Sequence, residues 1–388
     1  MRLPALRELL LELAGTAQRP DLSGLTAADW AALGRMAAQH RIEPLLHRRW
    51  HDAPDIPEAT AASWQAAHRQ ASLLGMVQRA ELREKVSLLE AAGFTPIALK
   101  GAWLAWQAYP EPGLRPLRDI DLLLPPDQVL AAMACLESHG YQRDPEAEMS
   151  PEECVRLDKH LPVLIAPRGT AVELHLRLWE LNQRLDHGLP ERSEEAVFAR
   201  AERGADGIAY PAAEDMLAHL VIHALYSHRL DCGPLILSDL AFLAAARPLD
   251  WDTVWTRAEA EGWRDGLRLL LDLVRQYRPE APVDLRGETT PAELRATAVQ
   301  LLLQDLDTRK SAGLAAATLK DGPAKLLRRL RGVNAAEGEA TVQRKMATDG
   351  GRIGWATDRA KRTLRDLVNA DVRRQSRQLA AISRWLDR

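Results

Sequence analysis

The chain has very few cysteines and no long apolar run. Its 388 residues include only 3 cysteines, which cannot form a paired disulfide framework and do not share the spacing of metal ligands. We expect buried thiols in a reducing compartment, and therefore a cytoplasmic protein. The apolar stretch near the N-terminus is too short and too charged to span a membrane. It also lacks the long apolar region and the cleavage site of a signal peptide.

An excess of charge of one sign is missing as well. Charged residues make up 27% of the chain, yet the formal net charge is only −3. This balance provides no global basic field, so we do not expect a nucleic-acid partner. The basic stretch from Lys325 to Arg388 is a local exception. We interpret it as a solvated helix face, with a substrate-docking surface or a weak polyanion contact as alternatives. The excess of Arg over Lys is typical of a GC-rich bacterial source.

The spacing of apolar residues changes twice along the chain, from helical to strand-like and back to helical. A chain of this length is long enough for more than one domain. We predict an N-terminal helical region (1–92), a catalytic core (93–190), a helical domain (191–331), a linker or mobile loop (332–354) and a basic C-terminal helix (355–388).

Short apolar runs between turn residues predict four strands in the core. These are 94–99, 117–124, 160–166 and 170–178, the last two joined as a hairpin by Pro167-Arg168-Gly169. Helix start signals occur at Thr26, a near-capping box with Asp29, and at Ser150, which is followed by Pro and two Glu. A short helix is expected to open at Gly101.

The most informative motif is the pair Asp119 and Asp121 at the head of an apolar strand. Side chains alternate faces along a strand, so the two carboxylates point the same way while Ile120 and Leu122 point into the core. Carboxylates on one face repel each other unless a cation lies between them. Mg²⁺ suits such an oxygen-rich pair, because it takes one or two carboxylates and fills its other positions with phosphates and water. Nucleotidyl transfer needs this arrangement.

A third carboxylate lies on a strand that alternates regularly. Glu173, His175 and Arg177 occupy its polar face. If this strand lies beside the first, Glu173 completes a three-carboxylate cluster that can hold two metal ions roughly 3.5–4 Å apart. The simpler interpretation is an exposed residue on a half-buried strand. A role for His175 is left open, because it would lie on the polar face with or without a site.

Basic residues and a glycine flank these carboxylates. Gly101 lies where a strand turns into a helix and allows a phosphate to approach the backbone closely, and Lys100 adds a positive charge. Arg115 and Arg118 could contact the outer phosphates or neutralise the carboxylates.

Together these motifs resemble the uncharacterised nucleotidyltransferase family of the DNA polymerase β-like superfamily. The resemblance covers about residues 70 to 245, with Leu99-Lys100-Gly101 as its more specific part. It implies an α/β (α+β) fold, with a nucleotidyltransferase-type mixed sheet core and extensive N- and C-terminal helical regions. One departure is Ala102-Trp103 after Gly101, because most of the superfamily carries Gly-Gly/Ser or Gly-Ser in that turn.

The resemblance and the motifs predict a metal-dependent nucleotidyltransferase. It would move a nucleoside monophosphate from an NTP donor to an acceptor hydroxyl on an unknown small molecule, peptide or saccharide, with Mg²⁺ or else Mn²⁺ as cofactor. The predicted catalytic and metal-binding residues are Asp119, Asp121 and Glu173, and the predicted phosphate ligands are Lys100, Gly101, Arg115 and Arg118.

Two other functions remain open: a non-catalytic nucleotidyltransferase-like binding or scaffold protein, and a nucleic-acid-directed enzyme. His219 and His223 have the i, i+4 spacing of transition-metal ligands, but we interpret them as hydrogen-bonded core residues.

Overall fold

A computed structural model describes residues 1–147, 149–179, 194–306, 309, 312 and 370–387. The predicted linker 332–354 lies outside the described residues, as does the first part of the predicted C-terminal helix. The chain divides into two compact units. The first contains Met1–Ser227 and Pro234–Thr290, and the second contains His228–Gly233 and Pro291–Arg388. The five predicted segments stay a prediction, because several of their boundaries fall on residues that are not described.

The first unit begins with helices: α1 (Leu3–Ala14), α2 (Ala27–Gln39), α3 (Glu43–Trp50) and α4 (Glu58–Ala91). The capping box predicted at Thr26 is confirmed, since its hydroxyl accepts from the Asp29 backbone N–H and the Asp29 carboxylate accepts from the Thr26 backbone N–H. The long helix α4 packs against α3 and against α6 (Val129–Ser138) of the core. The N-terminal helices therefore belong to the same unit as the sheet.

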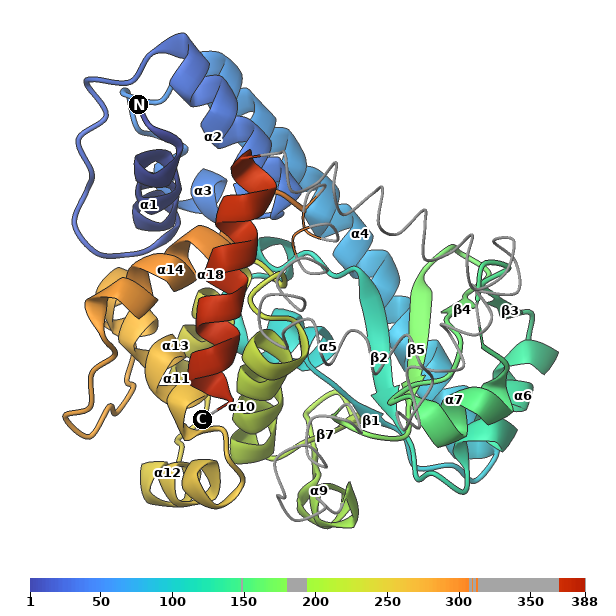
Figure 1. The fold of residues 1–388 in the computed structure, drawn as a ribbon. Coiled ribbons are helices and arrows are strands. Elements are labelled where there is room, and N and C mark those ends of the chain that lie inside the picture. The colour runs from blue at the N-terminus through green and yellow to red at the C-terminus, as the bar shows by residue number, and fades with distance from the viewer. Residues whose placement is uncertain (148, 180–193, 307–308, 310–311, 313–369, 388) are drawn as a thin grey trace, which may run out of the picture. The chain divides into compact units, whose positions relative to one another are not determined.

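The core sheet has five strands in the order β1-β2-β5-β4-β3 (Figure 1). The strands are β1 (Ile97–Ala98), β2 (Asp119–Leu123), β3 (Gln142–Arg143), β4 (Leu164–Ile165) and β5 (Ala171–His175). The pair β2 and β5 is parallel and the other pairs are antiparallel. All four predicted strands exist, although each is shorter than expected. The fold is thus a mixed α/β fold of the predicted class.

Helices connect and surround these strands. Between β1 and β2 the chain forms α5 (Gly101–Trp103), the π-helical turn η1 (Leu104–Ala108) and η2 (Pro112–Leu114). After β3 comes α7 (Pro151–Leu157), which has the capping box predicted at Ser150. The remaining elements of this unit are α9 (Glu194–Arg200), β6 (Glu202–Arg203), β7 (Ala209–Tyr210), α10 (Ala213–Ile222), η3 (His223–Ser227), α11 (Leu235–Ala246), α12 (Trp251–Ala260) and α13 (Arg264–Tyr277).

Three short strands and one helix differ from the expectation. Strands β3 and β6 each consist of two exposed polar residues and β7 has only two residues, so none of them is marked by an apolar run of strand length. The helix predicted over 213–228 is α-helical only to Ile222 and continues as the π-helical turn η3. Such turns are rare and frequently occur at functional sites.

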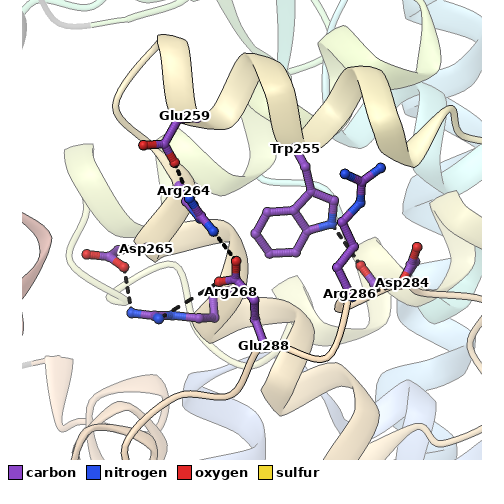
Figure 2. A network of polar contacts seen from close by, with 8 residues as sticks. All are labelled: Trp255, Glu259, Arg264, Asp265, Arg268, Asp284, Arg286 and Glu288. Carbon is purple, nitrogen blue, oxygen red and sulfur yellow. Dashed lines mark hydrogen bonds and ion pairs between the residues drawn. The ribbon is translucent and has the colours of Figure 1, made fainter.

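The segment after α13 is fixed by a polar network (Figure 2). Arg264 binds both Glu259 of α12 and Glu288 of the following loop. The indole N–H of Trp255 donates to the Asp284 carbonyl oxygen at 3.0 Å. These contacts tie the last loop of the first unit to α12 and α13, and most of them are ion pairs at the surface, which individually contribute little stability.

In the second unit, the described residues form α14 (Ala292–Leu302) and α18 (Ala370–Leu386), which pack against each other. Gln375 donates to the Gln304 side chain at 2.7 Å in a buried contact. In the described part of the chain, every helix is too short or too polar to cross a lipid bilayer.

A buried lysine on α4 has an unusual environment. The Lys85 side chain is fully buried, and its Nζ has no hydrogen-bond partner among the described residues. It lies 5.9 Å from the centre of the Tyr141 ring. Burial lowers the pKa of Lys85 to about 8, although the nearby carboxylates Glu81 and Glu84 oppose the shift. A charged ammonium at this place therefore destabilises the folded state.

Replacement of Lys85 by Met should change how stability depends on pH. Between pH 8 and 10 the unfolded chain binds the lysine proton more strongly than the folded one, so deprotonation stabilises the fold. We expect the unfolding free energy of the wild type to rise by about 2 kcal/mol relative to Lys85→Met over this range. Urea denaturation followed by tryptophan fluorescence measures both proteins, and their difference removes the contribution of tyrosine titration. Parallel pH profiles would contradict the burial argument.

Candidate active site

The parallel pairing of β2 and β5 brings two of the predicted carboxylates together. In the register of the two strands, Asp121 is the direct partner of Glu173 and Asp119 is the partner of Ala171. Asp121 and Glu173 therefore lie at the same height on neighbouring strands, and their side chains project from the same face of the sheet. The condition on which Glu173 would join the aspartates, that the two strands lie side by side, is met.

Two cationic groups compensate for this concentration of negative charge. The Nε2 atom of His175 lies 2.9 Å from Asp121 Oδ1 and 3.2 Å from Glu173 Oε2. The Nζ atom of Lys100 lies 3.4 Å from Asp121 Oδ2. His175, which the sequence left open, is therefore part of the cluster.

A divalent metal ion has a possible ligand set in this cluster. Among the described residues, Asp121, Glu173 and His175 are the only three His, Cys, Asp or Glu side chains whose ligand atoms all lie within 4.8 Å of one another. The predicted set contained Asp119 instead of the histidine. Two carboxylate oxygens and one imidazole nitrogen form a mixed donor set. Mn²⁺ accepts such a set more readily than Mg²⁺, which prefers oxygen ligands.

Electrostatics separate the roles of the three carboxylates. Burial raises the pKa of Asp121, but Lys100 and the hydrogen bond from His175 outweigh burial, and its pKa lies well below the ordinary value. Burial also raises the pKa of Glu173, but the hydrogen bond from His175 and the charges of His160 and His175 together lower it. Burial lowers the pKa of His175 itself, but its hydrogen bonds to the two carboxylates raise it above the ordinary value. The imidazolium and the two carboxylates thus stabilise one another.

Asp119 differs from its neighbours. Burial and the negative charges of Asp121 and Glu173 raise its pKa to about 6, since Lys100 and Arg115 compensate only in part. Asp119 lies close enough to interact electrostatically with Asp121 and Glu173, but it is not one of the three side chains that could together hold a metal ion. Its predicted role as a metal ligand stays a prediction.

The turn that carries Lys100 is tightly built. Lys100 has a φ of 42°, a left-handed conformation that side chains rarely adopt, and the chain passes directly into α5. A Cβ atom on Gly101 would lie 2.5 Å from Arg115 Nη1 and 2.6 Å from Leu117 Cδ2. The space beside the Gly101 Cα atom is therefore filled by protein side chains. Its predicted contact with phosphate stays a prediction.

Arg115 is held by a carboxylate from a distant helix. Its Nε and Nη2 atoms donate to the two oxygens of Asp239 on α11, at 2.8 and 2.9 Å. The Tyr109 hydroxyl donates to the same carboxylate at 2.7 Å. This bidentate pair fixes the segment between α5 and β2. Arg118 has no such partner in the described structure, and its side chain is exposed.

Several histidines near the cluster were not expected there. His160 lies 3.8 Å from Glu173, and the centre of its ring lies 5.3 Å from that of His175, with the two rings tilted by 58°. Burial and the charges of Lys100 and His175 lower the pKa of His219 far below its ordinary value, so this ring is neutral. His223, on the π-helical turn, adds positive potential at Asp121. The i, i+4 spacing of the last two was the only sequence signal, and it did not show which element they face.

A family model described as uncharacterised nucleotidyltransferase matches residues 26–279, more than half of the chain. The chain belongs to this family. The match includes the N-terminal helices from α2 onward, the whole core sheet and the helices to the end of α13. No curated protein and no solved structure matches the chain significantly.

Substitution of Gly101 by Ala tests the packing of the turn. Both atoms that a new Cβ would meet belong to side chains that cannot easily move, because Arg115 is held by Asp239 and Leu117 is buried. We expect Gly101→Ala to lower the unfolding free energy by about 1–3 kcal/mol. The control is Gly34→Ala in α2, where no neighbouring atom lies within 4 Å of the new Cβ and a gain of about 0.5–1 kcal/mol is expected. Equal stability of the two variants in urea denaturation would refute this packing.

Proposed function

We propose that this protein is a metal-dependent nucleotidyltransferase that moves a nucleoside monophosphate from an NTP to an acceptor hydroxyl, with pyrophosphate as leaving group. The observation that carries the proposal is the group formed by Asp121, Glu173 and His175 on the paired strands β2 and β5. Membership of the nucleotidyltransferase family supports the same reaction class. The acceptor class stays open between small molecules, peptides and saccharides.

The residues present fit a divalent cation. Asp121 and Glu173 offer oxygens, and His175 offers a nitrogen whose ring is fully buried and therefore held in one place. A bound Mn²⁺ or Mg²⁺ would neutralise phosphate charge and lower the pKa of the acceptor hydroxyl. A cation at this place would compete with Lys100 and with the protonated His175 for the carboxylate oxygens. Metal affinity therefore depends on how readily Lys100 moves away and His175 loses its proton.

The side chains around this centre have different access to a substrate. Asp121 has a side-chain exposure of only 6%, whereas Glu173 has 21%. We infer that Asp121 acts on the metal alone, and that Glu173 also reaches the acceptor hydroxyl to orient it or accept its proton. Of the four predicted phosphate ligands, two are already paired with carboxylates. Lys100 forms an ion pair with Asp121, and Arg115 forms one with Asp239. Arg118 keeps its guanidinium available for the phosphates of the donor.

A second candidate function is favoured by the same ion pair. Lys100 at 3.4 Å from Asp121, together with His175, balances the carboxylates without a metal ion. In a non-catalytic binding or scaffold protein this pairing would be permanent. Such a protein would bind neither metal nor NTP at the cluster, or would bind NTP without turnover.

Metal binding separates these functions first. We expect the wild type to bind Mn²⁺, measured by electron paramagnetic resonance of the free ion, and Asp121→Asn to bind it at least about tenfold more weakly, because it loses one charged ligand. Asp127→Asn is the matched control, since Asp127 is exposed and lies beyond the other end of β2. Similar loss in both variants would mean that the cluster is not the metal site.

Turnover is then measured as pyrophosphate release from each of the four NTPs with candidate acceptors. Wild type and Asp127→Asn should react in Mg²⁺ or Mn²⁺, and Asp121→Asn and Glu173→Gln should not. A wild-type protein that binds no nucleotide in either metal would rule out the proposed reaction. Nucleotide binding without release of pyrophosphate with any acceptor would favour the scaffold function.

A further inference from the structure

A cavity of about 430 Å³ lies at the N-terminal ends of β2 and β5. Arg118, directly before β2, and Thr170, directly before β5, form one side of it. The end of α2 and one face of α4 form the other side. Its volume is within the range of small-molecule sites, and its wall combines apolar groups such as Leu117 with a few polar ones. All of these elements belong to the first unit.

The wall of this cavity is rich in arginine. Arg41, Arg118 and Arg168 line it, and Glu43 is the one carboxylate among the described lining residues. Arg168 is paired with Glu84 at 2.9 Å. Within the described residues, the guanidinium groups of Arg41 and Arg118 form neither a hydrogen bond nor an ion pair with a carboxylate. The cavity thus presents two guanidinium groups that are not paired directly with a carboxylate and that can form bidentate hydrogen bonds.

The backbone of Arg41 gives an independent reason to regard its side chain as functional. Its N–H donates to the Ala38 carbonyl and the N–H of Ile42 donates to the Ala37 carbonyl, both at 3.1 Å. These two bonds form the Schellman motif that ends α2, with Arg41 at the position where glycine is normally found. Its φ of 56° confirms the left-handed conformation. An arginine retained there is less favourable for the fold than a glycine.

Arg41 interacts electrostatically with Arg118 and with Asp119 at the start of β2. Burial and the charge of Arg118 lower the pKa of Arg41, and the carboxylate of Asp119 raises it. The three groups are therefore close enough to interact.

We propose that this cavity binds a phosphate or polyphosphate group, with Arg41 and Arg118 as its ligands. Planar guanidinium groups match the oxygens of a phosphate, and two of them without carboxylate partners favour an anion over a neutral ligand. The phosphate belongs either to the NTP donor or to a phosphorylated acceptor. Binding of the anion stands on the cavity alone, whereas its assignment to donor or acceptor rests on the proposed function.

The experiment uses the full-length protein in low salt with EDTA, so that no metal contributes. Isothermal titration calorimetry measures the affinity for tripolyphosphate and for glycerol phosphate. We expect Arg41→Gly and Arg118→Gln each to weaken binding of the preferred anion about tenfold or more, and added salt to weaken it in the wild type. Arg35→Gln, which removes an exposed arginine of α2 outside the cavity, should bind as the wild type does.

Thermal unfolding distinguishes a binding role from a structural one. Because glycine suits the left-handed position, Arg41→Gly should unfold at the same temperature as the wild type or up to about 3 °C higher. Weaker anion binding in a protein of equal or greater stability supports the proposal. A large loss of stability in Arg41→Gly, or unchanged affinity for both anions in both cavity variants, would overturn it.

The choice of anion identifies the source of the phosphate. Tripolyphosphate binding that ATP displaces, together with weaker ATP binding in Arg41→Gly, assigns the cavity to the donor. Glycerol phosphate binding that ATP does not displace assigns it to the acceptor. Both results support a phosphate site, and both can be obtained if the protein proves unable to catalyse transfer.

Discussion

The site depends on one constraint, which is that two carboxylates are forced together by the parallel pairing of β2 and β5. Asp121 and Glu173 are direct partners across the strands, so neither can move away without breaking the sheet. Their repulsion must be balanced where little water is present, and an unbalanced buried charge is costly. Lys100 and His175 supply that balance in the described structure. A divalent cation is the other group that can do so, which is why the same geometry suits metal-dependent chemistry.

The position of Lys100 in turn depends on residues far along the chain. Its left-handed conformation begins the turn into α5, and Gly101 leaves room there for Arg115. Arg115 is held by Asp239, which lies on α11, beyond the predicted limit of the catalytic core. The helices after the core are therefore part of the site. They fix the turn that carries the compensating charge, and α10 and η3 each bring one histidine toward the cluster.

The N-terminal helices also contribute residues to a cavity at the sheet, the one lined by Arg41 and Arg118. Arg41 follows α2 and is more than seventy residues away from Arg118 in sequence, yet both line one cavity next to Asp119. The carboxylate cluster and this arginine cavity have opposite charges. The family match, which begins within the capping box of α2, includes both.

The sequence by itself determined what depends on local periodicity and on nearest neighbours. Alternation along the two central strands was enough to predict that Asp119, Asp121 and Glu173 share a face, and the capping boxes at Thr26 and Ser150 follow from residues three apart. Strand β3 consists of two exposed polar residues and contains no apolar run, so it was missed, whereas the equally short β1 and β4 lie within apolar runs and were predicted. Only the tertiary structure decided which side chains complete the cluster. His175 lies with Asp121 and Glu173 in the ligand group, and Arg115 pairs with Asp239, because contacts between distant segments depend on how helices and sheet pack. That packing is set by the whole core, and no local pattern encodes it.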